Sequence, residues 1–85
     1  MKDAIYPMRA VVRQTGLTAH VIRAWERRYR AVVPHRTPSR RRLYSMADIE
    51  RLKLLKRGVG VGNSIAQIAK MDTEALQALV MPAAA

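Results

Sequence analysis

Apolar residues recur at helical spacing near the start of the chain. Met8, Val11 and Val12 fall at positions i, i+3 and i+4, which is typical of the buried face of a helix. We expect this helix to start at residues 6–7, where a proline costs little because the first helical N–H has no partner within the helix. Gly16 suits the left-handed residue that closes such a helix. The pattern therefore predicts a first helix that ends at this glycine.

A second helix is predicted from Thr18, a favourable N-cap residue, to Pro34, which ends it. Its apolar stripe comprises Val21, Ile22, Trp25 and Tyr29. Its basic stripe comprises His20, Arg23, Arg27 and Arg30. Because the two stripes lie on different faces, we expect the first to face the core and the second to face solvent. Two helices joined by a short glycine turn, the second with a basic outer face, form a helix-turn-helix pattern.

Residues 35–44 carry a turn signal between two basic segments. Pro38 and Ser39 are typical turn residues. The pattern predicts a small β-hairpin, or wing, in which Leu43 points inward while the arginines stay in solvent.

Three more helices are predicted after the wing. Ser45 and Asp48 resemble a capping box that starts the first of them. Its apolar positions are Ile49, Leu52, Leu54 and Leu55. The glycines at 58, 60 and 62 are read as a break that ends this helix.

The last two predicted helices are short. Residues 64–70 form the first, with Ile65, Ile68 and Ala69 inward. Asp72 or Thr73 then caps a final helix that buries three apolar positions. These positions are Leu76, Leu79 and Val80.

The length and composition are those of one small folded domain. The chain has 85 residues, of which 49% are apolar, and a domain of this size buries a modest core. We expect a flexible N-terminus at residues 1–5, the domain at residues 6–80 and a tail at residues 81–85.

The charge of the chain points to an anionic partner. The formal net charge is +10, and residues 23–42 hold eight arginines and a single acid, Glu26. Aromatic residues lie among these arginines, which favours double-stranded DNA as the partner. An anionic membrane surface is the weaker alternative because it would need a basic helix backed by a broad apolar face, and we expect no membrane binding.

Few residues suit catalysis or metal binding. There is no cysteine, only two histidines are present, and the six acids are dispersed. The glycines around residue 60 match no phosphate-binding motif. We therefore predict no enzymatic activity, no metal site and no cofactor in this chain.

Six motifs in the same order resemble the DNA-binding domain of the MerR family of bacterial regulators. They are residues 15–18 (T-G-L-T), 22–29 (I-R-A-W-E-R-R-Y), 36–37 (R-T), 42–45 (R-L-Y-S), 48–49 (D-I) and 62–69 (G-N-S-I-A-Q-I-A). The resemblance runs from Tyr6 to about Val80 and looks strongest to the subgroup with a cobalamin-binding or other light- or ligand-sensing domain downstream. It implies a mainly α fold, a winged helix-turn-helix with a small β-hairpin wing and following helices.

The resemblance also implies DNA contacts at matching positions. These positions are Thr18, His20, Arg23, Arg27, Arg28, Arg36, Arg41, Arg42 and Tyr44. The chain departs from the family at Arg30, where glycine is usual, and at Arg40, where glycine or a small residue is usual. Both departures add positive charge.

The residues themselves suggest how the contacts divide. Arg23 and Arg27 are expected to read base edges, since arginine can bind guanine O6 and N7 together. The wing arginines, Arg40 included, are expected to meet phosphates or a narrow minor groove. A solvated basic face is the alternative for each of them, and pairing with Glu26 is an alternative for Arg28.

Three alternative functions stay open from the sequence. One is an excisionase-like architectural factor that bends DNA, and another is a basic module that docks an acidic protein antagonist. An RNA-binding role ranks last because exposed aromatic platforms are lacking. We expect a fragment or an unusually short protein, cytoplasmic and nucleoid-associated, that is a monomer when free and a dimer or higher in a longer parent or on DNA.

Overall fold

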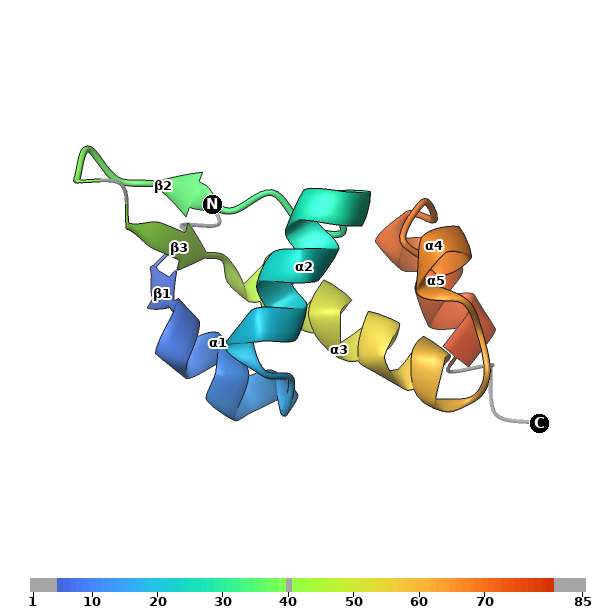
Figure 1. The fold of residues 1–85 in the computed structure, drawn as a ribbon. Coiled ribbons are helices and arrows are strands. Elements are labelled where there is room, and N and C mark those ends of the chain that lie inside the picture. Colours follow the sequence, from blue (N-terminus) through green and yellow to red (C-terminus); the bar gives the residue numbers. More distant parts are fainter. Residues whose placement is uncertain (1–4, 40, 81–85) are drawn as a thin grey trace.

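The computed structural model describes residues 5–39 and 41–80. In chain order the elements are β1 (Tyr6–Pro7), α1 (Met8–Thr15), α2 (Ala19–Tyr29), β2 (His35–Arg36), β3 (Arg42–Tyr44), α3 (Met46–Gly60), α4 (Ile65–Ile68) and α5 (Thr73–Val80). Figure 1 shows the small sheet at one end of the molecule, α4 and α5 at the other, and α2 between them. The predicted fold class, mainly helical with a winged helix-turn-helix, is confirmed.

The wing strands, β2 and β3, are two of the three strands of an antiparallel sheet rather than a separate hairpin. The strand order is β1-β3-β2, with Tyr6 opposite Tyr44 and Arg36 opposite Arg42. Residues 6–7, predicted as the start of the first helix, therefore form a strand. Pro7 is extended, with φ −74° and ψ 167°, and becomes the N-cap of α1. A proline is tolerated here because β1 is an edge strand.

The turn between α1 and α2 is fixed by hydrogen bonds at both helix ends. Gly16 has φ 78°, and its N–H donates to the Val12 carbonyl at 2.9 Å, which confirms the predicted left-handed closure. Lys56 reaches across from α3 and donates to the Thr15 carbonyl at 3.2 Å. Thr18 accepts a hydrogen bond from the Val21 N–H at 3.1 Å, as expected of an N-cap.

Helix α2 ends earlier than predicted. It stops at Tyr29, because Arg30 adopts a left-handed conformation with φ 51° and its N–H donates to the Glu26 carbonyl at 3.0 Å. The next two residues, Ala31 and Val32, are buried, so the chain must turn back toward the core at this point. The prediction that Pro34 ends the helix was wrong.

Helix α3 continues through Gly58 and Gly60, the first two of the three glycines at which a break was predicted. Ser45 and Asp48 form the expected capping box, with hydrogen bonds of 3.1 and 2.9 Å. A Cβ on Gly58 would lie 2.7 Å from Ile68 Cδ1 and 3.3 Å from Val80 Cγ1. This glycine therefore allows α4 and α5 to pack closely on α3, and the chain turns only at Gly62, with φ 106°.

The C-terminal helices are tied to the rest by Arg51 of α3. Its Nε donates to the Ala31 carbonyl at 2.6 Å, and its Nη2 donates to the Ala69 carbonyl at 2.9 Å. Its Nη1 lies 3.3 Å from Thr73 Oγ1 at the start of α5. One guanidinium thus joins α4 and α5 to the segment that follows α2.

The two short helices differ in part from their predicted form. Helix α4 spans only Ile65–Ile68, and Asp72 caps α5 by accepting from the Ala75 N–H at 2.8 Å. Leu76 is fully buried as predicted, but Leu79 is 43% exposed.

The core lies along α3, where α1, α2 and the sheet pack on one part of it and α4 and α5 on another. Its fully buried large side chains are Val11, Ile22, Tyr44, Ile49, Leu52, Leu55 and Leu76. Val21, Trp25 and Tyr29 of α2 are half-buried against it, so the apolar stripe of this helix faces inward as predicted. No helix within residues 5–39 and 41–80 is long and apolar enough to cross a membrane.

Candidate nucleic-acid interface

The basic stripe of α2 faces solvent. Its predicted members His20, Arg23, Arg27 and Arg30 are all exposed, as is Arg28. Thr18, also predicted as a contact, is exposed at the N-terminus of this helix. The apolar contacts of α2 with the core thus leave a row of cations on its outer side.

The wing presents its arginines unequally. Arg36 of β2 is exposed, and so is Arg41, just before β3, whereas Arg42 is half-buried. Thr37 closes the turn, because its N–H donates to the Arg41 carbonyl at 3.0 Å and its hydroxyl accepts from the Arg41 N–H at 3.1 Å. Arg40 lies outside the described residues.

The face of β3 that turns toward α2 differs from the prediction. Alternate residues of a strand point to opposite faces, so Arg42 and Tyr44 share one face and Leu43 lies on the other. Leu43 is only half-buried, while the Tyr44 side chain is fully buried. The prediction that Leu43 points inward and every arginine stays in solvent is therefore corrected.

Glu26, with 8% of its surface exposed, links the wing to α2. Its Oε2 accepts a hydrogen bond from the Tyr44 hydroxyl. Its Oε1 lies 3.3 Å from Arg42 Nε, without the alignment of a hydrogen bond, so this attraction is ionic. The carboxylate does not pair with Arg28, the alternative partner weighed from the sequence. Sequence reasoning missed this role, although a single acid among eight arginines was a usable signal.

Tyr44 is not placed to contact DNA. Its side chain has 0% exposure, and burial raises the pKa of its phenol, with the hydrogen bond to Glu26 acting in the same direction. The phenol therefore stays protonated as the donor to Glu26. We remove Tyr44 from the contact set and assign it to the packing of the wing.

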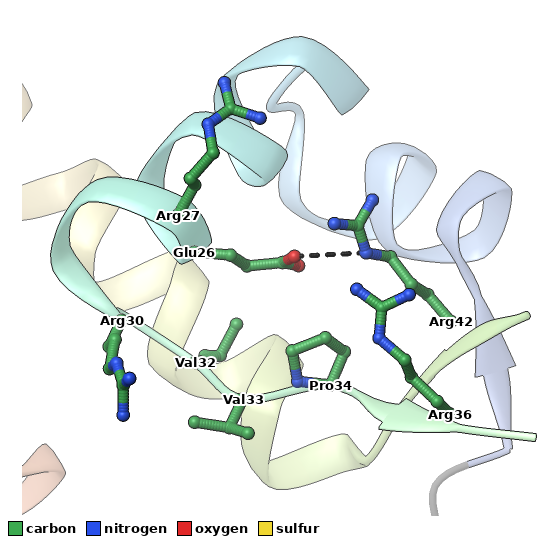
Figure 2. A pocket seen from close by; sticks show the side chains of 8 residues that line it. All are labelled: Glu26, Arg27, Arg30, Val32, Val33, Pro34, Arg36 and Arg42. Atoms are coloured by element: carbon green, nitrogen blue, oxygen red, sulfur yellow. Dashed lines mark ion pairs between the residues drawn. The ribbon is translucent and has the colours of Figure 1, made fainter. Parts of the chain in front are cut away.

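A hollow between α2 and the wing gathers cations from both. Arg27 lines it from α2 and Arg30 from the C-cap of that helix, Arg36 and Arg42 line it from the wing, and Val32, Val33 and Pro34 form its apolar side. In Figure 2 the side chains of Arg36 and Arg42 rise from the two wing strands, and Arg30 points away from the ion pair of Glu26 with Arg42. We call this the α2–wing hollow.

A second hollow lies on the other side of Arg42. Its lining residues are Pro7, Met8, Arg9, Arg23, Arg41 and Arg42. We call it the α1 hollow, since α1 contributes Arg9, a residue the sequence analysis did not single out. Arg42 lines both hollows, so it brings Arg23 and Arg27 of α2 to one continuous basic surface with the wing.

This surface has the chemistry of a polyanion site. Its only acid among the lining residues is Glu26, which is buried and paired. No group of three or more metal-ligating side chains occurs within residues 5–39 and 41–80. A surface of guanidinium groups on a helix and an adjoining wing can neutralise phosphates and reach base edges.

Comparison with known proteins gives the family. The sequence profile described as MerR HTH family regulatory protein matches residues 6–75. The chain belongs to this family. The prediction from the sequence motifs is thereby confirmed, and the domain is a MerR-family helix-turn-helix domain of the DNA-binding, transcription-regulating type.

Three curated relatives are similar to the chain over this domain. The chain is 35% identical to the HTH-type transcriptional repressor CarH of Myxococcus xanthus over 79 residues, or 93% of this chain and 26% of that protein. It is 32% identical to the HTH-type transcriptional regulator MlrA of Escherichia coli K12 over 65 residues, or 76% of this chain and 27% of that protein. The MlrA of Salmonella typhimurium LT2 matches to the same extent. The chain thus spans about a quarter of the length of these curated relatives, all of which are named as transcriptional regulators or repressors.

Proposed function

We propose that the chain binds double-stranded DNA sequence-specifically, with α2 in the major groove and the wing on the flanking backbone or minor groove. The observation that carries the proposal is the shared basic surface, where the exposed row of α2 and the wing arginines meet at Arg42. A major groove about 12 Å wide admits one helix. An adjoining strand pair then lies beside the groove, over the phosphates.

The roles divide by element. Arg23 and Arg27, on the exposed side of α2, read base edges, and His20 and Arg28 contact the groove or its edge. Arg36 and Arg41 neutralise phosphates, and Thr18 adds a contact at the N-terminus of α2. Arg42 is anchored by Glu26 and lies where both groups meet.

The context of the parent protein belongs to the proposal as well. The activity is regulatory and not enzymatic, and the site of action is the bacterial nucleoid in the cytoplasm. A downstream sensor domain that binds cobalamin or another ligand stays a prediction, as does dimerisation in a longer chain or on DNA. Residues 6–80 act as the DNA-binding unit.

The test separates base reading from phosphate binding. A duplex is selected from a random pool, and its affinity is compared with that of a scrambled duplex for Arg27→Ala and for the double variant Arg36→Ala, Arg41→Ala. We expect Arg27→Ala to lower the preference for the selected duplex by about 1–3 kcal/mol. The wing variant should weaken both duplexes alike and reduce the salt slope by about 1.8, since each phosphate contact contributes ~0.9.

The control is Arg57→Ala, which removes one exposed arginine from α3 outside both hollows. It should leave the preference unchanged. Equal losses on both duplexes for Arg27→Ala would reject base reading by α2. An unchanged slope in the wing variant would remove the wing from the interface.

A further inference from the structure

The α1 hollow contains a cation that neither the helix-turn-helix pattern nor the wing accounts for. Arg9 is exposed on the first turn of α1 and shares the hollow with Arg23, Arg41 and Arg42. These four arginines come from α1, α2 and β3 or the residue before it. The sequence did not predict that these four arginines form one cluster. Arg9 lies fourteen residues before Arg23, and the packing of α1 against the sheet brings it to the same hollow.

The position of Arg9 follows from the unexpected strand β1. Pairing of Tyr6 with Tyr44 and of Pro7 with Leu43 places the start of α1 against β3. Had residues 6–7 been helical, α1 would start two residues earlier and this register would be lost. The same strand pairing that corrects the sequence prediction therefore sets Arg9 beside the wing.

The charges of the hollow are poorly compensated by the described residues. None of its lining residues is an acid. Within residues 5–39 and 41–80, the only ion pair at the hollow joins Arg42 Nε to the buried Glu26, which holds the Arg42 side chain without engaging Arg9, Arg23 or Arg41. Guanidinium groups repel one another when they converge, and an anion between them removes that repulsion.

The form of the hollow selects the anion. It is open to solvent and apolar only at Pro7 and Met8, so it offers no pocket for an organic body. Guanidinium groups match the paired oxygens of a phosphate. No acid lies in the first turn of α1, and its N-cap makes no side-chain hydrogen bond, so nothing local opposes an anion there.

We propose that Arg9 binds a phosphate of the DNA backbone in the α1 hollow, together with Arg41 and Arg42. This inference rests on the proposed function and adds a third DNA-binding element, α1, to α2 and the wing. Arg23 borders the hollow from α2, so it is shared between this phosphate and the groove. Arg9 belongs to neither α2 nor the wing and is therefore the residue to test.

The first measurement is the salt dependence of binding to a labelled random-sequence duplex. Arg9→Ala should reduce the slope of log K against log salt by ~0.9, which corresponds to an affinity loss of about eightfold at 0.1 M salt. Arg9→Lys keeps the charge and should preserve the slope. Arg57→Ala, the charge-matched control on α3, should leave the slope unchanged. A loss in Arg9→Ala no greater than that in Arg57→Ala would overturn the proposal.

The second measurement locates the phosphate. Neutral methylphosphonate linkages are placed one at a time along a selected duplex, and each duplex is bound to the natural chain and to Arg9→Ala. At the linkage bound in the hollow, the neutral group should weaken DNA binding by the natural chain. It should cause little further loss of affinity in Arg9→Ala, so the two changes are not additive. Additive losses at every linkage would mean that Arg9 acts through overall charge only, which would also overturn the proposal.

The outcomes distinguish this proposal from the proposed function. If the natural chain binds duplex selectively but Arg9→Ala leaves affinity and salt slope unchanged, then α2 and the wing form the DNA interface and α1 is not part of it. Absence of duplex binding by the natural chain would refute the proposed function, and the Arg9 proposal with it. Circular dichroism of each variant checks that the fold is kept.

Discussion

The link between α2 and the wing can be tested by separating its two interactions. Glu26 accepts from the Tyr44 hydroxyl and attracts Arg42 at 3.3 Å, and its side chain is 6% exposed. The variants are Glu26→Gln, which keeps the shape, Tyr44→Phe, which removes only the hydroxyl, and the double variant. If the hydrogen bond is made to a charged carboxylate, the two single changes must depend on each other.

The magnitude follows from the burial of these groups. A hydrogen bond to a charged group contributes about 1.5–3 kcal/mol, and a neutral one about 0.5–1.5 kcal/mol. Tyr44→Phe should therefore cost about 2 kcal/mol in the natural chain but about 1 kcal/mol when Gln is at position 26. The interaction free energy is then about 1 kcal/mol, which exceeds the 0.3–0.5 kcal/mol scatter expected of independent sites.

The assay is urea unfolding followed by circular dichroism and by the fluorescence of Trp25, the single tryptophan. Tyr29→Phe is the matched control, because Tyr29 is half-buried and no hydrogen bond of its hydroxyl occurs within the described ranges. Its effect should add to that of Glu26→Gln. Additive effects of Tyr44→Phe and Glu26→Gln would refute the link between wing and helix.

Three further predictions concern stability and can be measured in the same way. Arg30→Gly should raise the free energy of unfolding by about 1 kcal/mol, since Arg30 has φ 51° and glycine adopts this conformation without the Cβ penalty; a loss would show that the side chain of Arg30 is needed at the helix end. Gly60→Ala should stabilise α3 by roughly 0.5–1 kcal/mol, since a Cβ there meets no atom within 4 Å. Gly58→Ala should be less stable than Gly60→Ala by about 1–2 kcal/mol because its Cβ meets Ile68. Equal effects of the two variants would contradict the close packing of α4 on α3. Burial raises the pKa of the Tyr44 phenol, so above pH 10 the folded chain holds this proton more tightly than the unfolded chain. The natural chain should therefore lose stability relative to Tyr44→Phe by up to about 1.4 kcal/mol per pH unit. If the free energies of unfolding of the two proteins fall in parallel above pH 10, the phenol is not buried.

The helices were largely predictable because their signals are local. Apolar spacing and caps such as Thr18 and the Ser45–Asp48 pair depend on residues within one or two turns. The family motifs then extended this local information to the wing and to the basic row of α2.

The errors occurred where distant packing overrides local preference. Gly58 is a helix-weakening residue by propensity, yet the approach of Ile68 and Val80 makes a small residue favourable inside α3. Arg30 ends α2 in a conformation that arginine rarely adopts, because the next residues must enter the core. Pro7 joins a strand because β3 offers it an edge.

The candidate site was predicted in its composition but not in its geometry. The exposed arginines of α2 could be assigned from periodicity, but the burial of Tyr44 and the pairing of Arg42 depend on the register of β3 with its neighbours. The part played by Arg9 depends on the same register. Side chains alternate between the two faces of a strand, so a shift of one residue exchanges them. A strand of three residues is too short for its sequence pattern to fix which face is buried.

The central claim is that the arginines of α2 and the wing form one surface that reads duplex DNA. Its most direct test is selection of the purified chain against a random pool of duplexes in the presence of heparin, followed by affinity measurements on enriched and scrambled sequences. Two base-reading arginines at about 1–3 kcal/mol each predict an enriched motif bound about thirtyfold or more tightly than the scrambled duplex. The account would be contradicted if no sequence is enriched and heparin displaces the bound duplexes as readily as competing duplex DNA does.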